Sequence, residues 1–240
     1  MPDATIYFAY PGDLDTATGG YRYDRQMIAE LRASGLTVES LSLPHLVPHP
    51  SQASLDSVAQ ALAALPDGTV VIIDGLAFGV MAAIAEREAQ RLRLVALCHH
   101  PLALESGLDG LRQRALFDSE RRALACARAT IVTSPHTRQI LIKQFAVPAS
   151  RITVALPGTD AVAFAACDGD PLRLLTVATL TRRKAHDVLI EALSTLVDLP
   201  WQARFVGGAE FDSAWAAELQ NRTADLGLSE RICFAGAVDS

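Results

Sequence analysis

Three consecutive cationic residues, Arg182, Arg183 and Lys184, stand between an apolar run typical of a buried strand and an amphipathic stretch typical of a helix. The first turn of a helix that begins there would present unpaired backbone N–H groups and the positive end of the helix dipole. Anionic groups such as phosphate bind at such a position. The structural alternative is a solvated basic helix start, on which His186 is a surface residue without a role.

Two adjacent histidines, His99 and His100, form a second candidate site within the sequence CHHP. They directly follow an apolar run, and open parallel sheets bind ligands at the carboxyl ends of their strands. Successive residues of a strand point to opposite faces, so we expect one imidazole to face the site while the other packs or meets water. Such a histidine is a candidate for proton transfer, and a purely structural histidine is the alternative. Glu105 is a candidate to orient either ring, whereas the sequence offers no third ligand for a metal ion.

Glycine-containing turns mark two further positions. Gly19 and Gly20 follow the first apolar run and open a predicted helix, where a missing side chain lets an anion approach backbone N–H groups. An ordinary flexible turn is the alternative there. Asp160, in the sequence LPGTD, is a candidate to line a cleft between two domains, or else belongs to a simple connection.

These residues are positioned by a recurring pattern of short apolar runs and helix-length amphipathic stretches, which predicts an α/β fold with a buried parallel sheet. The expected strands of the first series are Ile6–Tyr10, Val38–Leu43, Val70–Asp74, Leu94–Cys98, Thr130–Thr133 and Ile152–Val154. The expected helices between them are Tyr21–Ala33, Ser54–Leu65, Ala77–Ala89, Leu108–Ala127 and Pro135–Phe145. A second series comprises strand Leu172–Ala178, helix Ala185–Leu196, strand Ala203–Val206, helix Ser213–Leu226 and strand Arg231–Phe234. We therefore expect a complete doubly wound, Rossmann-like domain over residues 1–165, a linker over 166–171 and a partial second Rossmann-like domain over 172–240.

Composition narrows the possible functions. The chain has 240 residues, half of them apolar, and a formal net charge of -6, which disfavours nucleic acid as a partner. Its four cysteines are scattered without a CxxC pair, which fits a reducing compartment and no metal site. No apolar run is long enough to span a membrane, and no signal peptide is evident at the start. Neither GxGxxG nor a P-loop is present, which disfavours an NAD-dependent epimerase or dehydrogenase and ATP hydrolysis.

Taken in order, these segments resemble glycosyltransferase family 4, retaining enzymes with the two facing Rossmann-like domains of the GT-B architecture. TGGYRYDRQMIAELRASG is similar to the Gly-rich loop and first helix of the family, and CHHP resembles its "CHFP"-like segment. LPGTD is similar to the "NGVD" element at the domain junction, and VATLTRRKAHDVLIEAL to "VGRLVPRKGVDVLLEAL". The resemblance covers essentially the whole chain. It implies transfer of a sugar from a nucleotide diphosphate sugar to a hydroxyl acceptor with retention, in a cleft between the domains.

The same resemblance implies roles for individual residues. His99, more than His100, is the implied catalytic residue beside the transferred sugar. Arg183 and Lys184 are implied to stabilise the departing diphosphate of the donor without a metal ion or other cofactor. The other implied donor-binding residues are Gly19, Gly20, Gly207 and Gly208, with His100, Asp160, Arg182 and Thr179 as further candidates.

Three positions depart from the family. Thr179 stands where the family usually has arginine, and Ala185 replaces a glycine, which we expect a helix start to tolerate. The E-x7-E element, which binds the sugar and ribose of the donor, would lie beyond Ser240. We therefore expect a chain that is truncated within its second domain. The alternative function is a catalytically incompetent fragment or split subunit that binds the acceptor or a partner chain.

The expected surroundings follow from these interpretations. The donor is a nucleotide sugar, and the acceptor is a glycan, a lipid-linked molecule or a small molecule. A partner chain is expected at the truncated sheet edge. The expected location is the cytoplasm, with peripheral contact to the inner membrane face.

Overall fold

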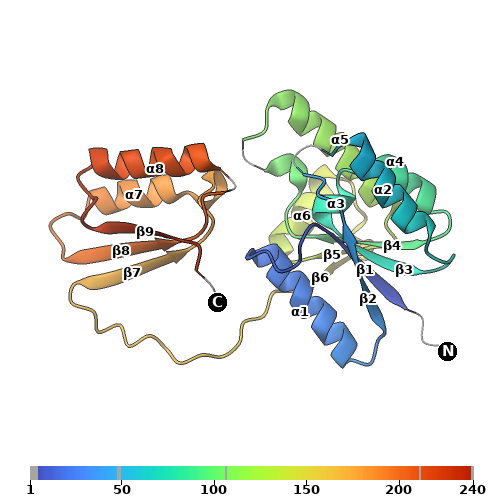
Figure 1. The fold of residues 1–240 in the computed structure, drawn as a ribbon, viewed down its shortest axis with the longest axis horizontal. Coiled ribbons are helices and arrows are strands. Elements are labelled where there is room, and N and C mark those ends of the chain that lie inside the picture. The colour runs from blue at the N-terminus through green and yellow to red at the C-terminus, as the bar shows by residue number, and fades with distance from the viewer. Residues whose placement is uncertain (1–4, 48–49, 106, 211, 239–240) are drawn as a thin grey trace. The chain divides into compact units, whose positions relative to one another are not determined.

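The computed structural model describes residues 5–47, 50–105, 107–210 and 212–238. The chain divides into two units, Met1–Thr159 (unit 1) and Asp160–Ser240 (unit 2), and each is described by itself. Between β6 and β7, residues 155–169 contain neither helix nor strand (Figure 1). None of the helices in the described part of the chain combines the length and the apolar composition that a membrane crossing requires.

Unit 1 contains a six-stranded sheet in the order β2-β1-β3-β4-β5-β6, and every neighbouring pair is parallel. Its strands are β1 (Ile6–Pro11), β2 (Val38–Leu43), β3 (Val70–Asp74), β4 (Arg93–Cys98), β5 (Ala129–Val132) and β6 (Ile152–Val154). Its helices are α1 (Gly19–Ala33), α2 (Gln52–Ala63), α3 (Gly75–Phe78), α4 (Ala82–Glu88), α5 (Gly110–Cys126) and α6 (Pro135–Gln144). The predicted α/β class and parallel sheet are thereby confirmed.

Both faces of the central strands β1, β3 and β4 are largely buried, which explains their near-continuous apolar runs. Alternate residues enter different cores: Phe8 and Ile72 pack against Ile28 of α1, whereas Ala9 and Ile73 join the larger core on the opposite face. In Figure 1, α1 lies on one side of the sheet, while α2, α4 and α5 lie on the other. Alternate side chains along each strand therefore point to opposite faces of the sheet and enter different layers.

The single helix expected over Ala77–Ala89 is wrong, because the structure has two helices, α3 and α4, in this region. Helix α3 begins directly after β3, where the Asp74 carboxylate accepts a hydrogen bond of 2.8 Å from the N–H of Leu76. The chain then turns at Gly79, where a side chain would lie 2.8 Å from Leu102. Tight packing against that segment therefore interrupts the helix at a residue that weakens helices.

Unit 2 contains a three-stranded parallel sheet in the order β7-β8-β9, formed by β7 (Leu172–Val177), β8 (Trp201–Val206) and β9 (Ile232–Gly236). Helices α7 (His186–Ser194) and α8 (Ser213–Asp225) lie on the same side of this sheet (Figure 1). Trp201, Phe205 and Trp215 are among the buried side chains between the sheet and these helices. The opposite face carries exposed Leu175 and Val177.

Candidate functional site

The carboxyl ends of β1, β3 and β4 form the edge of the unit 1 sheet at which we locate the candidate site. The chain leaves β1 toward β2 on one side and later returns to place β3 on the other, so the topology reverses between β1 and β3. Open α/β sheets bind ligands in the crevice at such a switch point. Gly19 and Gly20 open α1 at this edge, and His99 follows the last residue of β4.

At this edge the His99 imidazole contacts two buried carboxylates. Its Nε2 lies 3.0 Å from Oδ1 of Asp24 on α1 and 3.5 Å from Oδ2 of Asp74 at the end of β3. The side chains of Asp24 and Asp74 are 0% and 2% exposed, whereas the His99 side chain is 24% exposed. The imidazole is therefore the member of this cluster that a ligand can reach.

Burial and proximity shift the pKa values of all three groups. Burial, followed by the charge of Asp24, raises the pKa of Asp74 to about 7. Burial also raises the pKa of Asp24, against the opposing effect of the hydrogen bond with His99. For His99, burial lowers the pKa, but the hydrogen bond to Asp24 and the two carboxylate charges outweigh it and raise the pKa overall. The cluster can therefore hold or move a proton near neutral pH.

Side chains of α1 and α6 enclose His99 on other sides. The ring of Tyr23 meets the imidazole edge-to-face at 5.2 Å, and its hydroxyl donates a hydrogen bond of 2.9 Å to the carbonyl of Ala155. The Thr137 hydroxyl donates to the backbone carbonyl of His99 at 3.3 Å. The Tyr21 hydroxyl donates to the carbonyl of Pro11 at 2.6 Å, and burial together with Asp74 and Asp24 raises the pKa of Tyr21 to about 12. The Tyr23 ring thus packs against the imidazole, and Thr137 holds the backbone that carries it.

The two predicted glycines differ in their surroundings. A side chain on Gly19 would meet nothing within 4 Å, so the protein leaves this position open to a ligand. A side chain on Gly20 would come within 3.6 Å of the His99 ring, which is ordinary contact distance. The Thr18 hydroxyl accepts the N–H of Tyr21 at 3.3 Å and so caps the helix. Gly20 thus lies beside the imidazole, and both glycines belong to a helix start whose remaining N–H groups can bind an anion.

His100 is directed away from this cluster. Its Nε2 lies 3.3 Å from the carbonyl oxygen of Leu104, within the segment that follows β4. The same segment is held by the buried carboxylate of Glu120 on α5, which accepts the N–H groups of Leu102 at 3.1 Å and Ala103 at 3.3 Å. Glu120 thereby supports the backbone that carries both histidines.

The free energy of unfolding of unit 1 is expected to fall as the pH rises from about 5 to about 8. Burial raises the pKa of Glu120 from 4.5 in model compounds to about 7 in the folded chain. The stabilisation from its protonated form is complete below the lower value and is lost as the pH rises through the higher one, which amounts to about 3 kcal/mol. In urea unfolding followed by circular dichroism, the free energy of unfolding should decrease less steeply with pH for Glu120→Gln than for the wild-type chain. An equally steep fall in both proteins would exclude Glu120 as the source.

In unit 2 the basic residues Arg182–Lys184 form a short 3-10 turn, η3, rather than the first turn of a helix. The prediction that these residues form the first turn of the helix is therefore wrong, because α7 begins at His186. The reason is Ala185, whose φ of 52° and ψ of 39° are left-handed and interrupt the helical path. This conformation favours glycine, so the expectation that Ala185 merely occupies a tolerant helix start is also wrong.

His186 is buried, so the alternative that it is a surface residue without a role is wrong. It is 1% exposed, and its ring lies 5.3 Å from that of Phe205 in the core of unit 2. Neither ring nitrogen has a hydrogen-bond partner among the described residues. Burial lowers the pKa of His186, which keeps the ring neutral and compatible with an apolar site.

The three cations of η3 have different surroundings. The Arg182 guanidinium lies 3.2 Å from the Glu218 carboxylate and 4.0 Å above the Trp215 ring, both on α8. Arg182 therefore serves to attach η3 to α8. The side chains of Arg183 and Lys184 are exposed, as is that of Asp160 at the start of the unit.

The loop that contains Thr179 approaches the glycine pair closely. The N–H of Leu180 donates to the carbonyl of Gly208 at 2.9 Å, next to the partly buried Thr179. A side chain on Gly207 would lie 1.8 Å from the carbonyl oxygen of Ala178, whereas the nearest atoms to one on Gly208 belong to the Glu210 carboxylate, at 2.0 Å. Gly207 is thus required by the fold of unit 2 itself.

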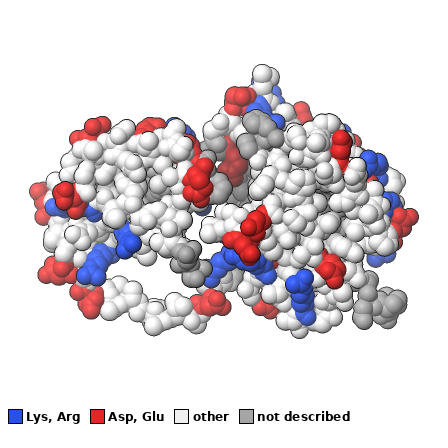
Figure 2. All heavy atoms as spheres, in the orientation of Figure 1, with Lys and Arg blue, Asp and Glu red and all other residues white. Residues whose placement is uncertain are grey.

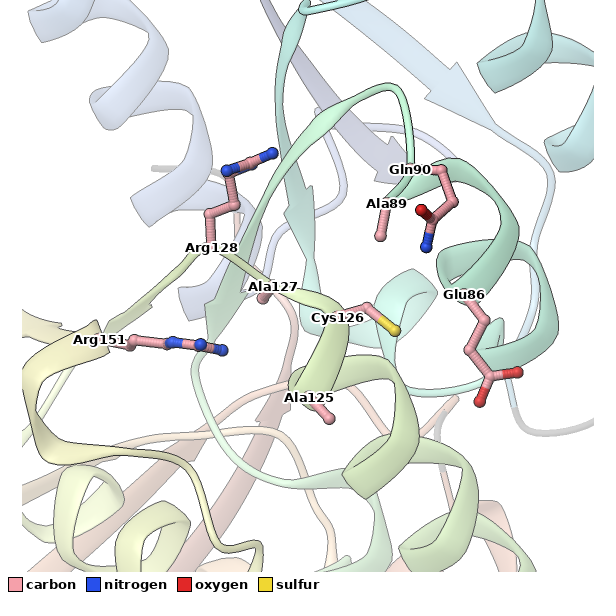
Figure 3. Close-up of a pocket in the computed structure, with 8 residues that line it drawn as sticks. All are labelled: Glu86, Ala89, Gln90, Ala125, Cys126, Ala127, Arg128 and Arg151. Atoms are coloured by element: carbon pink, nitrogen blue, oxygen red, sulfur yellow. The ribbon is translucent and has the colours of Figure 1, made fainter.

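A hollow elsewhere in unit 1 has a volume of about 580 Å³. It is lined by Glu86, Ala89, Gln90, Ala125, Cys126, Ala127, Arg128 and Arg151 (Figure 3). Arg128 and Arg151 directly precede β5 and β6, so this hollow lies at the amino ends of the strands, whereas His99 lies at the carboxyl edge. It is therefore separate from the candidate site.

On the face shown in Figure 2, basic side chains are interspersed with acidic ones.

Sequence reasoning missed Asp24, Asp74 and Glu120. Asp24 shares one buried face of α1 with Tyr21 and Ile28, so an acidic residue within an apolar helical stripe was the available signal. Asp74 ends the otherwise apolar strand VVIID at the carboxyl edge, which was a second signal. Both acids are far in sequence from His99, and only the sheet topology brings them together.

Comparison with known proteins agrees with this architecture. The model of the family described as Glycosyltransferase Family 4 matches residues 21–162. A glycosyltransferase from Rickettsia africae is 14% identical, with a TM-score of 0.62 over 100% of this chain and 69% of that chain. Alr3699/HepE from Anabaena, in complex with UDP-glucose, is 18% identical, with a TM-score of 0.64 over 97% of this chain and 69% of that chain. At these identities the likeness shows the GT-B fold alone. No curated protein sequence matches the chain significantly.

Proposed function

The chain belongs to glycosyltransferase family 4, and from this premise we propose that it transfers a sugar from a nucleotide diphosphate sugar to a hydroxyl acceptor with retention of configuration. The observation that carries the proposal is the partly exposed His99 imidazole, held by Asp24 at the switch point of the unit that the family model matches. In this proposal His99 contacts the transferred sugar or assists the reacting hydroxyl. Gly19 and Gly20 allow the substrate to approach the backbone.

Arg183 and Lys184 are the proposed donor-phosphate residues. Both are exposed in unit 2, and they adjoin Arg182, which contacts Glu218 and Trp215. Two cationic side chains can stabilise the charge of a departing diphosphate, and we propose that no metal ion takes part. Gly208 and the Thr179 loop belong to the same proposed region. The acceptor is a glycan, lipid-linked or small molecule, and the proposed location is the cytoplasm, peripheral to the membrane.

Calorimetry against UDP-, GDP- and ADP-sugars tests the proposal, with inorganic phosphate as the control and EDTA present. UDP-glucose is the first choice because Alr3699/HepE was crystallised with it. Saturable binding of one donor, followed by release of the nucleoside diphosphate on adding an acceptor, is the expected result. A folded chain that binds none of the donors would contradict the proposal.

Replacing Lys184 by alanine should weaken binding of the nucleoside diphosphate by about 1.5–3 kcal/mol, the contribution of a charge-assisted hydrogen bond. The chain contains one other lysine, Lys143 on α6, which supplies a matched control. Calorimetry of Lys184→Ala and Lys143→Ala should show weakened binding for the first variant alone. Equal affinities for the two variants would remove Lys184 from the donor site.

A further inference from the structure

Two carboxylates converge on one nitrogen of His99. Oδ1 of Asp24 lies 3.0 Å from Nε2, and Oδ2 of Asp74 lies 3.5 Å from the same atom. Both acids are fully buried, and the second oxygen of Asp24 has no hydrogen-bond partner among the described residues. Ionised carboxylates accept hydrogen bonds and do not donate them, so an ionised Asp24 at this distance accepts a hydrogen bond from a proton on Nε2.

The two carboxylates come from different structural elements. Oδ1 of Asp74 accepts the N–H of Leu76 and starts α3, which leaves Oδ2 for the imidazole. Asp24 comes from α1, the helix that Gly19 and Gly20 begin. Helix α1 and the residue that caps α3 therefore both direct an acid toward the residue after β4.

We propose that Asp24 and Asp74 are positioning residues that hold the His99 imidazole with Nε2–H toward the carboxylates, leaving Nδ1 to accept a hydrogen bond from a substrate hydroxyl. This inference rests on the proposed function, which puts His99 beside the transferred sugar. A histidine whose one nitrogen is held by a carboxylate has a fixed tautomer and orientation. The nitrogen that meets the substrate is thereby an acceptor, as a group that receives a hydroxyl proton must be.

Other charged and titratable groups surround the cluster. Tyr21 and Tyr23 of α1 are near Asp24, Arg25 acts on the Asp24 charge, and Cys98 precedes His99 on β4. The groups that raise the pKa of the imidazole are the carboxylates of Asp24 and Asp74. Their neutral amide variants should therefore lower it.

Nitrogen NMR of the histidine side chains in the full chain tests the tautomer, with His99→Ala used to assign the signal. At a pH above the pKa of His99, the neutral imidazole of the wild-type chain should carry its proton on Nε2. Asp24→Asn should lower the pKa of His99 and reduce turnover about tenfold, with the donor KM unchanged. Asp74→Asn, whose amide oxygen can still cap α3, is a second variant and should act in the same direction. Asp13→Asn, an exposed acid after β1, is the matched control and should change neither quantity.

Three results would overturn the positioning role: a neutral wild-type imidazole that carries its proton on Nδ1 and not on Nε2, an unchanged imidazole pKa in both variants, or an unchanged turnover in both. Stoichiometric binding of Zn²⁺ or Mn²⁺ that disappears in Asp24→Asn would also overturn it, because the three side chains would then be metal ligands. The NMR measurement needs no substrate. A wild-type chain with the expected tautomer but no sugar transfer would refute the proposed function and leave the geometry of the cluster established.

Discussion

Replacing Gly207 by alanine is expected to reduce the free energy of unfolding of unit 2 by about 3 kcal/mol, at the upper end of the cost of inserting a methyl group into packed structure. The new methyl would lie 1.8 Å from the carbonyl oxygen of Ala178. Neither backbone segment can retreat easily: the N–H of Ala178 donates to Val206 and the N–H of Gly207 donates to Gly236, each at 2.9 Å. Relief of the clash must therefore break sheet hydrogen bonds.

Tryptophan fluorescence during urea unfolding measures this effect in unit 2 alone. The chain has two tryptophans, and Trp201 and Trp215 both lie in the unit 2 core. Gly208→Ala is the control, because its methyl would meet the mobile end of the Glu210 side chain, and it should cost less than about 1 kcal/mol. Equal stability of wild type and Gly207→Ala would contradict the prediction, because the backbone around Ala178 would then move aside without cost. The result also decides how nucleotide binding by Gly207 variants is interpreted, since an unfolded unit 2 cannot bind.

Replacing His99 by alanine is expected to lower turnover about 100-fold, within the range that positioned acid–base groups contribute. The nucleoside diphosphate should still bind within about threefold of its wild-type affinity, because the proposed phosphate residues Arg183 and Lys184 belong to unit 2. Steady-state release of the nucleoside diphosphate, combined with calorimetry, separates the two effects.

His100→Ala is the matched control for this experiment. The His100 ring contacts the Leu104 carbonyl, within its own loop, so its loss should change turnover less than about threefold. Circular dichroism should verify that both variants fold, since His99→Ala leaves two buried acids without their imidazole. A larger loss of turnover in His100→Ala than in His99→Ala would refute the assignment of His99.

Much of the secondary structure was predictable from the sequence because apolar residues form continuous runs in the central strands, as in Val70–Asp74, and recur between polar ones in the edge strands, as in Val38–Leu43. Val38–Leu43, Val70–Asp74 and Ile152–Val154 have the predicted bounds in the structure. The start of α7 was not predictable in this way, since propensity treats Ala185 as a helix former while the chain holds it in the left-handed region. Local preference was overridden there by the packing of η3 against α8, through Arg182 and Trp215.

The histidine of the candidate site could be selected from its place after a strand, but its partners could not. Asp24 and His99 are 75 residues apart, and their contact depends on the register of β1, β3 and β4. Glu105, the acid near His99 in sequence, was the natural candidate to orient the ring, yet Asp24 is the carboxylate that forms the 3.0 Å contact. Spacing along the chain therefore indicated the imidazole and missed the acids that hold it.

The all-parallel strand order also governs how the chain can fold during synthesis. Parallel neighbours cannot be joined by a tight hairpin, so each pairing must close a long crossover before it gains any hydrogen bonds. The first strand is the extreme case, because Ile6 pairs with Val38 on one edge and with Val70 on the other. Until residue 70 has left the ribosome, one edge of β1 has no partner and is open to pairing with other chains. The early nascent chain is therefore the stage at which unit 1 most needs protection from aggregation.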